Sequence, residues 1–90
     1  MSHVTNETMR KRIILIVGAY IRMRERLNLK PEQINVKRLT YQYGFKNFTR
    51  ITLLSKELEK MITIRATLRS KKIVPMASES CASIFQALGV

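Results

Sequence analysis

Apolar residues recur every three or four positions in the first third of the chain, which is the spacing of one face of an α-helix. They are Met9, Ile13, Ile16, Val17, Tyr20 and Leu27. A capping side chain is available at Thr5, Asn6 or Thr8. The pattern therefore predicts a helix from about residue 7 to 28, preceded by a flexible N-terminus over residues 1–7. A buried strand is the alternative for the β-branched run IILIV, but the Arg, Met and Glu residues around it favour the helix.

A proline and a glycine divide the middle of the chain. Pro31 disfavours helix at the residue before it, so the first helix is expected to end earlier. The next apolar pattern fits a two-turn helix with Val36, Leu39, Thr40 and Tyr43 inward. Gly44 is expected to end it with a positive φ, which glycine adopts at least cost. Another helix is predicted from about Asn47 to Lys60, with Ile51, Leu54, Leu58 and Met61 on one stripe.

The stretch LTYQYGFKNFTRITLL, residues 39–54, resembles the helix-turn-helix pattern. The apolar anchor, small residue, glycine, following apolar residue and second apolar helix of that pattern are matched by Leu39, Thr40, Gly44, Phe45 and Leu54. A small residue lets two helices cross closely, and Phe45 can fill the angle between them. Arg50 stands where the pattern has valine or isoleucine, so the turn is expected to be one residue longer. An ordinary corner between packed helices is the alternative.

Residues 61–74 can be interpreted in two ways. In MITIRATLR, residues 61–69, apolar and polar side chains alternate as in a half-buried strand, and RSKK (69–72) would turn into a return strand at Ile73 and Val74. Alternatively the preceding helix continues, since the apolar positions also keep helical spacing. The helix would place Arg65 on the apolar stripe and crowd it with β-branched residues. We therefore favour the β-hairpin.

A helix-turn-helix followed by a basic hairpin resembles the winged-helix superfamily, here over residues 8–76. A weaker resemblance, carried by TRITLLSKELEK (49–60) and the RSKK turn, is to the winged-helix protein of the eukaryotic small ribosomal subunit, whose basic surface binds ribosomal RNA. These resemblances imply a mainly α fold with a small β-hairpin. They also imply nucleic-acid binding through the second helix and the wing.

One more helix is predicted over residues 78–89. Its cap is Ser78 or Ser80, its apolar face is Cys81, Ile84, Phe85 and Leu88, and Gly89 ends it. The other side of this helix has almost no charge, so it can pack in the core, dock a protein partner or form a homodimer. No low-complexity stretch, repeat or linker interrupts the sequence. We therefore expect a single winged-helix-like domain over residues 1–90.

The charge of the chain favours a polyanionic ligand. It carries 17 Lys and Arg against six acidic residues, with a net charge of +11 and a pI of about 10.6. Such an excess favours phosphates of DNA or RNA, in a regulator or a ribonucleoprotein. The candidate contacts are Arg10, Lys11, Arg12, Lys46, Asn47, Thr49, Arg50, Lys56, Lys60, Arg65, Arg69, Lys71 and Lys72. The alternative is a helical adaptor or assembly subunit with an acidic partner.

Other classes of function find little support in the residues. There is no Asp, and the six Glu form no obvious pair for acid–base catalysis. His3 and Cys81 are too few to ligate zinc, and the three glycines make no phosphate loop, so we expect no catalytic site, metal or cofactor. The apolar run from Ile13 to Ile21 is far shorter than the roughly 20 residues that span a bilayer, so we expect no membrane segment. A lone cysteine fits an intracellular protein, in cytoplasm or nucleus. Tyr41 can stack on a base or be an ordinary, partly exposed residue.

Overall fold

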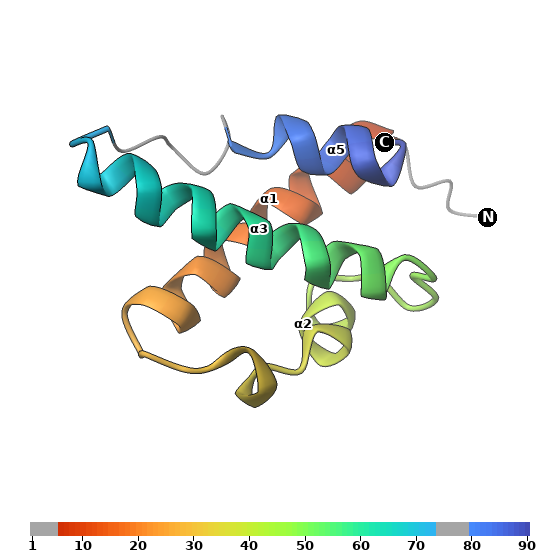
Figure 1. The fold of residues 1–90 in the computed structure, drawn as a ribbon. Helices are drawn as coiled ribbons and strands as arrows, with labels where there is room; N and C mark the ends of the chain where they lie inside the picture. The colour runs from red at the N-terminus through yellow and green to blue at the C-terminus, as the bar shows by residue number, and fades with distance from the viewer. Residues whose placement is uncertain (1–5, 74–79) are drawn as a thin grey trace.

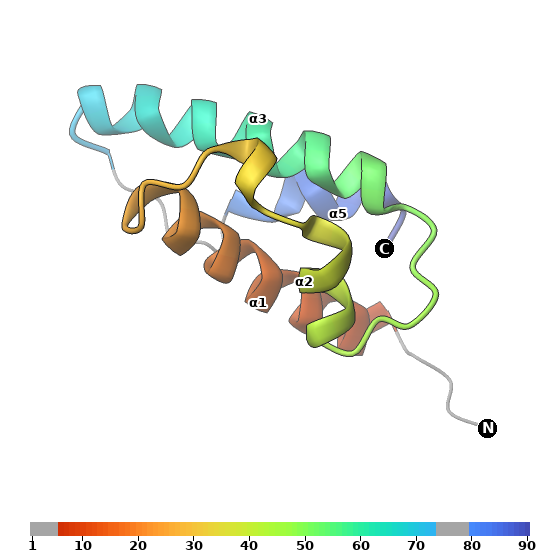
Figure 2. The same ribbon diagram turned by 90° about the horizontal axis from the view of Figure 1, so that it is seen from below.

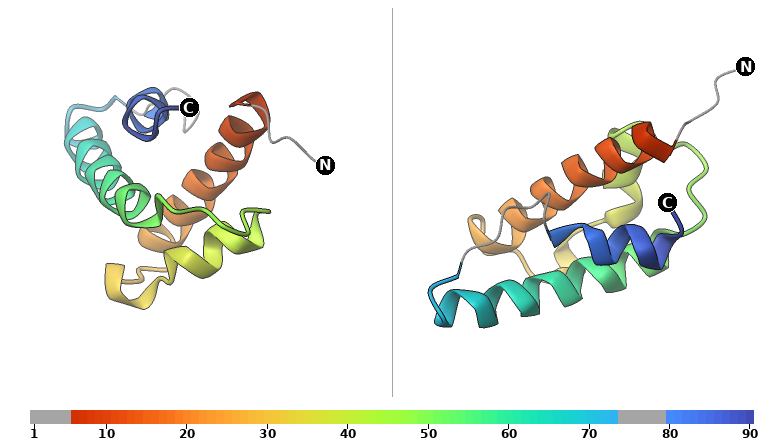
Figure 3. Two further views of the ribbon diagram at one scale, coloured as in Figure 1. Left: turned by 90° about the vertical axis from the view of Figure 1, so that its right-hand side faces the viewer. Right: turned by 90° about the horizontal axis from the view of Figure 1, so that it is seen from above.

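Two long helices form the centre of the protein in a computed structural model, which describes residues 6–73 and 80–90. Helix α1 spans Asn6–Glu25 and helix α3 spans Ile51–Ser70. The short helix α2 (Val36–Gln42) and the 3-10 turn η1 (Pro31–Gln33) lie on one side of this pair, and α5 (Ala82–Leu88) lies on the other (Figure 1, Figure 2). α1 and α3 run in roughly the same direction, while α5 runs back along α3 (Figure 3).

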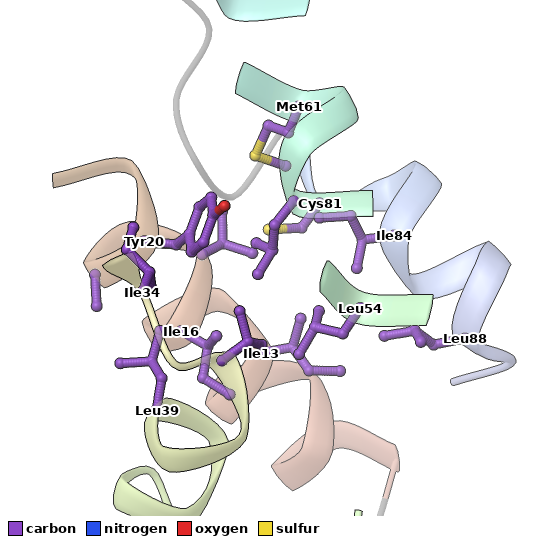
Figure 4. Packing of buried hydrophobic residues seen from close by; sticks show 14 of the residues in the cluster. Ile13, Ile16, Tyr20, Ile34, Leu39, Leu54, Met61, Cys81, Ile84 and Leu88 are labelled. Carbon is purple, nitrogen blue, oxygen red and sulfur yellow. The ribbon is translucent and has the colours of Figure 1, made fainter. Parts of the chain in front are cut away.

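The core is built from the apolar stripes of the α-helices in residues 6–73 and 80–90. α1 contributes Ile13, Ile16, Val17 and Tyr20, four of the positions that the periodicity of the sequence indicates. Leu27, which was also predicted to face inward, lies beyond the end of α1 and is 61% exposed. From α3 and α5 come Leu54, Leu58, Met61, Ile84 and Leu88, and Cys81 is buried beside them (Figure 4). The helical interpretation of IILIV is therefore correct. The spacing of three and four residues aligns one side of each helix toward the shared core.

A buried tyrosine ties α1 to α3. The Tyr20 hydroxyl donates a hydrogen bond to the Glu59 carboxylate, which also accepts two bonds of 3.0 Å from the Arg24 guanidinium. Arg24 donates a third bond to the Leu29 carbonyl, 2.9 Å away, and so holds the chain that follows α1. Burial raises the pKa of Tyr20, and its hydrogen bond to Glu59 raises it further. This cluster joins the C-terminal part of α1 to the middle of α3.

The corner between α2 and α3 is only partly as predicted. The Asn35 side chain caps α2 by accepting a bond from the Arg38 amide at 3.0 Å. Gly44 has φ 98°, as expected for the end of this helix. However, α3 begins at Ile51 and not near Asn47. The intervening loop is held by Phe45 and Phe48, whose rings stack 4.7 Å apart, so its residues are fixed by packing and not by helical hydrogen bonds.

The predicted wing is wrong. Residues 61–70, expected to be the first strand and the start of the turn, continue α3 to Ser70, and no strand occurs in residues 6–73 or 80–90. Arg65 does lie on the inward stripe, but its guanidinium reaches Glu25 of α1, so the charge is compensated. The β-branched residues cost only a few tenths of a kcal/mol each in a helix. Thr63 and Thr67 also donate hydrogen bonds of 3.2 Å to the carbonyls one turn before them.

The winged helix-turn-helix fold is therefore replaced by an assembly of helices alone in the described part of the chain. The buried face and the end of the last helix agree with the sequence, since Cys81, Ile84 and Leu88 are buried and Gly89 ends it at φ 72°. Its start does not, because α5 begins at Ala82 with Cys81, and not Ser80, at the N-cap position. Some expectations fall outside the described residues: those on His3, Thr5, Val74 and Ser78, and most of the N-terminal segment 1–7.

Candidate nucleic-acid interface

Four arginines from α1 and α3 surround a groove between the C-terminal halves of these helices. Arg22 comes from the last turn of α1, and Arg26 directly follows this helix, with its amide still donating a 2.9 Å bond to the Arg22 carbonyl. Arg65 and Arg69 come from the last turns of α3. The groove has a volume of about 520 Å³, and Gly18, Ile21 and Glu25 complete its lining. We call it the arginine groove. A spacing of four residues places Arg65 and Arg69 on one side of α3, and the bond from the Arg26 amide to the Arg22 carbonyl keeps the same spacing at the end of α1, so both pairs line the same groove.

A single glutamate organises the arginines of α3. The Glu25 carboxylate accepts bonds of 3.2 and 3.3 Å from Arg65 Nε and another from Arg69. Glu25 and Arg65 are only 16% and 15% exposed, so this pair is shielded from solvent. The lining of the groove holds four arginines and one glutamate, so it keeps a net charge of +3. The arginine groove is therefore a preformed concentration of positive charge.

Arg22 and Arg26 were not among the contacts predicted from the sequence. Both are exposed, and within residues 6–73 and 80–90 their guanidinium groups have no hydrogen-bond or ion-pair partner. The sequence contains a signal that could have found them, because Arg22, Glu25 and Arg26 share one side of a helix. It did not reveal that Arg65 and Arg69 lie opposite, since this requires the packing of α1 against α3.

Two of the predicted wing residues follow directly on the groove. Lys71 and Lys72 lie just after α3, and both are exposed. Lys72 has φ 61°, and its amide donates a 2.9 Å bond to the Arg69 carbonyl, which helps to end the helix. Instead of forming the tip of a hairpin, these lysines extend the positive charge of the arginine groove beyond the end of α3.

Three other predicted contact residues hold the opposite end of the protein together. Arg10 donates a 2.9 Å bond to the Val90 carbonyl and lies 5.5 Å from the centre of the Phe85 ring. Arg12 bonds to the Gly44 carbonyl at 3.3 Å and lies 5.7 Å from the centre of the Phe45 ring. Arg50 donates to the Leu88 carbonyl at the end of α5. These interactions give all three arginines a structural role.

The remaining predicted residues are dispersed. Lys46, Asn47 and Thr49 are exposed in the loop before α3, not on the helix itself. Lys56 and Lys60 are exposed on α3, with Lys60 3.3 Å from Glu57. Lys11 is exposed on α1, 3.6 Å from Glu7. The structure thus does not bring the thirteen candidates into one surface; of these, Arg65, Arg69, Lys71 and Lys72 lie together.

No protein-family model, curated protein or solved structure matches this chain. None of the helices in the described part of the chain combines the length and apolar character needed to cross a bilayer.

Proposed function

We propose that this protein binds nucleic acid through phosphate contacts in the arginine groove. The observation that supports this proposal is one groove lined by four arginines and a single glutamate, with two of the four guanidinium groups unengaged within the described residues. A guanidinium presents several N–H donors in a planar fork that matches the oxygens of a phosphate. Lys71 and Lys72 extend the contact along the backbone of the ligand.

The charge of the whole molecule supports a polymer over a small anion. A net charge of +11 on 90 residues attracts a polyanion from beyond the groove, and its binding releases condensed counterions. The proposed contacts are to phosphates, which position a protein without specifying a base sequence. We therefore propose binding with little sequence preference at the groove, to DNA or RNA.

The proposed role is binding and not catalysis. Cys81 is the one thiol of the chain, and its side chain is fully buried in the core. Burial raises the pKa of this thiol to about 11, so it stays protonated near neutral pH and is a poor nucleophile. The same burial makes it a packing residue between α5 and the long helices.

A pair of charge variants tests the proposal. Arg22→Gln with Arg26→Gln removes the two unengaged arginines, and Lys11→Gln with Lys30→Gln removes two exposed charges elsewhere, so both variants have the same net charge. Affinities for a duplex DNA, a structured RNA and an acidic polypeptide are measured by fluorescence anisotropy across a salt series. The arginine variant should reduce the slope of log affinity against log salt by about two on nucleic acid. The lysine variant should change it less.

Two results would contradict the proposal. Equal losses in the two variants would mean that net charge, and not the arginine groove, determines binding. Affinity of the wild-type protein that is independent of salt would exclude phosphate contacts, because about six contacts imply a loss on the order of 10³-fold between about 50 and 200 mM salt. The DNA and RNA series, compared with each other, decide between the two polymers.

A second candidate function is supported by a different surface. A pocket of about 480 Å³ lies between α3 and the start of α5, with Met61, Ile64 and Leu68 among its lining residues. Ile64 is 54% exposed there. Exposed apolar side chains around a pocket are typical of protein-binding sites, so a helical adaptor with a protein partner is the alternative. Preferential binding of the acidic polypeptide in the same assay would favour it.

A further inference from the structure

Aromatic and basic side chains surround a small pocket at the corner between α2 and α3, far from the arginine groove. Its volume is about 210 Å³. We call it the aromatic corner and define it by Tyr41, Phe45, Phe48, Lys37, Lys46 and Asn47, which are among its lining residues. α2 and the loop before α3, which supply these residues, lie together at one end of the protein (Figure 2). The small volume suits one flat ring system and not a drug-sized ligand.

Two phenylalanines make the base of this pocket rigid. Phe45 is buried, its ring stacks on that of Phe48 with an interplanar angle of 30°, and Arg12 lies against it. Phe48 is only half-buried, so part of its ring remains available in the pocket. The loop is therefore held in place before any ligand arrives, which lowers the entropic cost of binding.

Tyr41 contributes an aromatic ring that the fold does not use. Its residue is 64% exposed on α2, while Leu39 and Thr40 of the same helix are buried. The exposed ring of a tyrosine keeps apolar surface in contact with water. A flat partner that stacks on the ring removes this surface from water, which is favourable. Tyr41 and Phe48 both line the pocket, so a ring that enters it meets aromatic surface from α2 and from the loop.

The charges around the aromatic corner identify the kind of ring. Lys37 and Lys46 line the pocket and are exposed, and their ammonium groups form no ion pair within the described chain. The lining contains no acidic residue. Asn47 adds an amide with both donors and an acceptor, which suits the edge of a nucleobase. Aromatic surface next to lysines is the combination that holds a base and the phosphates on either side of it.

We infer that the aromatic corner binds an unpaired base of single-stranded nucleic acid by stacking it on Tyr41. This inference rests on the proposed nucleic-acid binding and adds a second site with a preference for strand form. A base within a duplex is already stacked on its neighbours and has no free face for Tyr41. The protein should therefore bind single strands more tightly than duplexes of equal length at the same salt concentration.

The two sites are far enough apart to be tested separately. Arg12, beside the aromatic corner, and Arg22, in the arginine groove, are 10 residues apart on α1, which is about 15 Å along the helix. Tyr41 is exposed on α2, so its replacement leaves the core intact. Tyr41→Phe retains the ring, and Gln42→Ala is a matched control because Gln42 is an exposed neighbour outside the pocket lining.

The experiment compares ligands with and without bases. Fluorescence anisotropy measures binding of oligothymidylate, oligouridylate, an abasic strand of equal length and a duplex of equal length, all at one salt concentration. Tyr41→Ala should weaken binding of the base-containing strands by about 5-fold to 150-fold and leave the abasic strand within about 2-fold. Tyr41→Phe and Gln42→Ala should bind the base-containing strands as the wild-type protein does.

The outcomes separate this inference from the proposed function. Equal effects of Tyr41→Ala on the base-containing and abasic strands, or equal wild-type affinity for both, would overturn the stacking site even if the protein binds nucleic acid. The Arg22→Gln, Arg26→Gln variant should weaken both kinds of strand alike, because its contacts are to phosphates. Failure of the wild-type protein to bind any of these ligands would overturn both proposals.

Discussion

Gly44 offers a prediction whose size can be worked out from the structure. Its φ of 98° lies in the region that disfavours residues with a side chain, and Gly44→Ala should cost about 1–2 kcal/mol for the backbone alone. A Cβ atom there would also lie 3.1 Å from Cζ of Arg12. The guanidinium would then have to shift slightly in its contact with Phe45 and in its bond to the Gly44 carbonyl. We expect unfolding free energy to fall by about 2 kcal/mol in total.

Gly18→Ala is the matched control for this substitution. Gly18 lies inside α1, its φ is helical, and an added Cβ would meet no atom within 4 Å. Alanine should therefore stabilise the helix by about 0.5–1 kcal/mol. For a domain of this size, thermal unfolding followed by circular dichroism should separate the two variants by at least about 10 °C in Tm.

The contrast between the two glycines can fail in a recognisable way. If Gly44→Ala unfolds at the same temperature as the wild-type protein, the loop adopts another backbone conformation and the positive φ is not required. If Gly18→Ala is as destabilising as Gly44→Ala, loss of the left-handed backbone is not the cause. Either result would refute the account of the α2–α3 corner given above.

Two further predictions concern charge and pH. Glu25→Gln should lower unfolding free energy by about 2 kcal/mol in urea titrations, because the shielded Arg65 loses its carboxylate partner. It should also raise affinity for single-stranded nucleic acid by about 5-fold, as the groove gains one positive charge; weaker binding by the folded variant would contradict the proposed groove. Burial raises the pKa of Cys81 from 9.0 to about 11, so its contribution to stability is complete below about pH 9 and is lost between about pH 9 and 11, by up to roughly 3 kcal/mol. Cys81→Ala should unfold with a smaller pH dependence in this range, and identical pH profiles would exclude that cause.

The sequence by itself determined the helices whose signals are local. Apolar spacing places Ile13, Ile16 and Tyr20 inward on α1, and the same spacing predicts the buried face of α5. The turn at Gly44 and the end of the last helix at Gly89 follow from the backbone freedom of glycine, so both could be predicted. Each of these features depends on residues only a few positions apart, and such residues are adjacent in the chain whatever the rest of the fold does.

Tertiary contacts decided the conformation of residues 61–70. The alternation in MITIRATLR fits a strand, but the stripe of Leu54, Leu58, Met61, Arg65 and Leu68 fits a helix equally well. Arg65 made the helix look unfavourable because its charge fell on the apolar side. Glu25, 40 residues earlier in the chain, accepts hydrogen bonds from Arg65 and compensates its charge, so the helix is no longer unfavourable. No local pattern contains this information.

The candidate site, like the fold, was determined partly by the sequence and partly by the tertiary structure. Net charge indicated a polyanion from composition alone, but it did not distinguish arginines that hold the fold from those that face solvent. Arg10, Arg12 and Arg50 bind backbone carbonyls of distant segments, while Arg22 and Arg26 lie across a groove from Arg65 and Arg69. Charge is a property of each residue and survives in any fold. Which charges converge depends on how α1 packs against α3, and only the tertiary structure sets that.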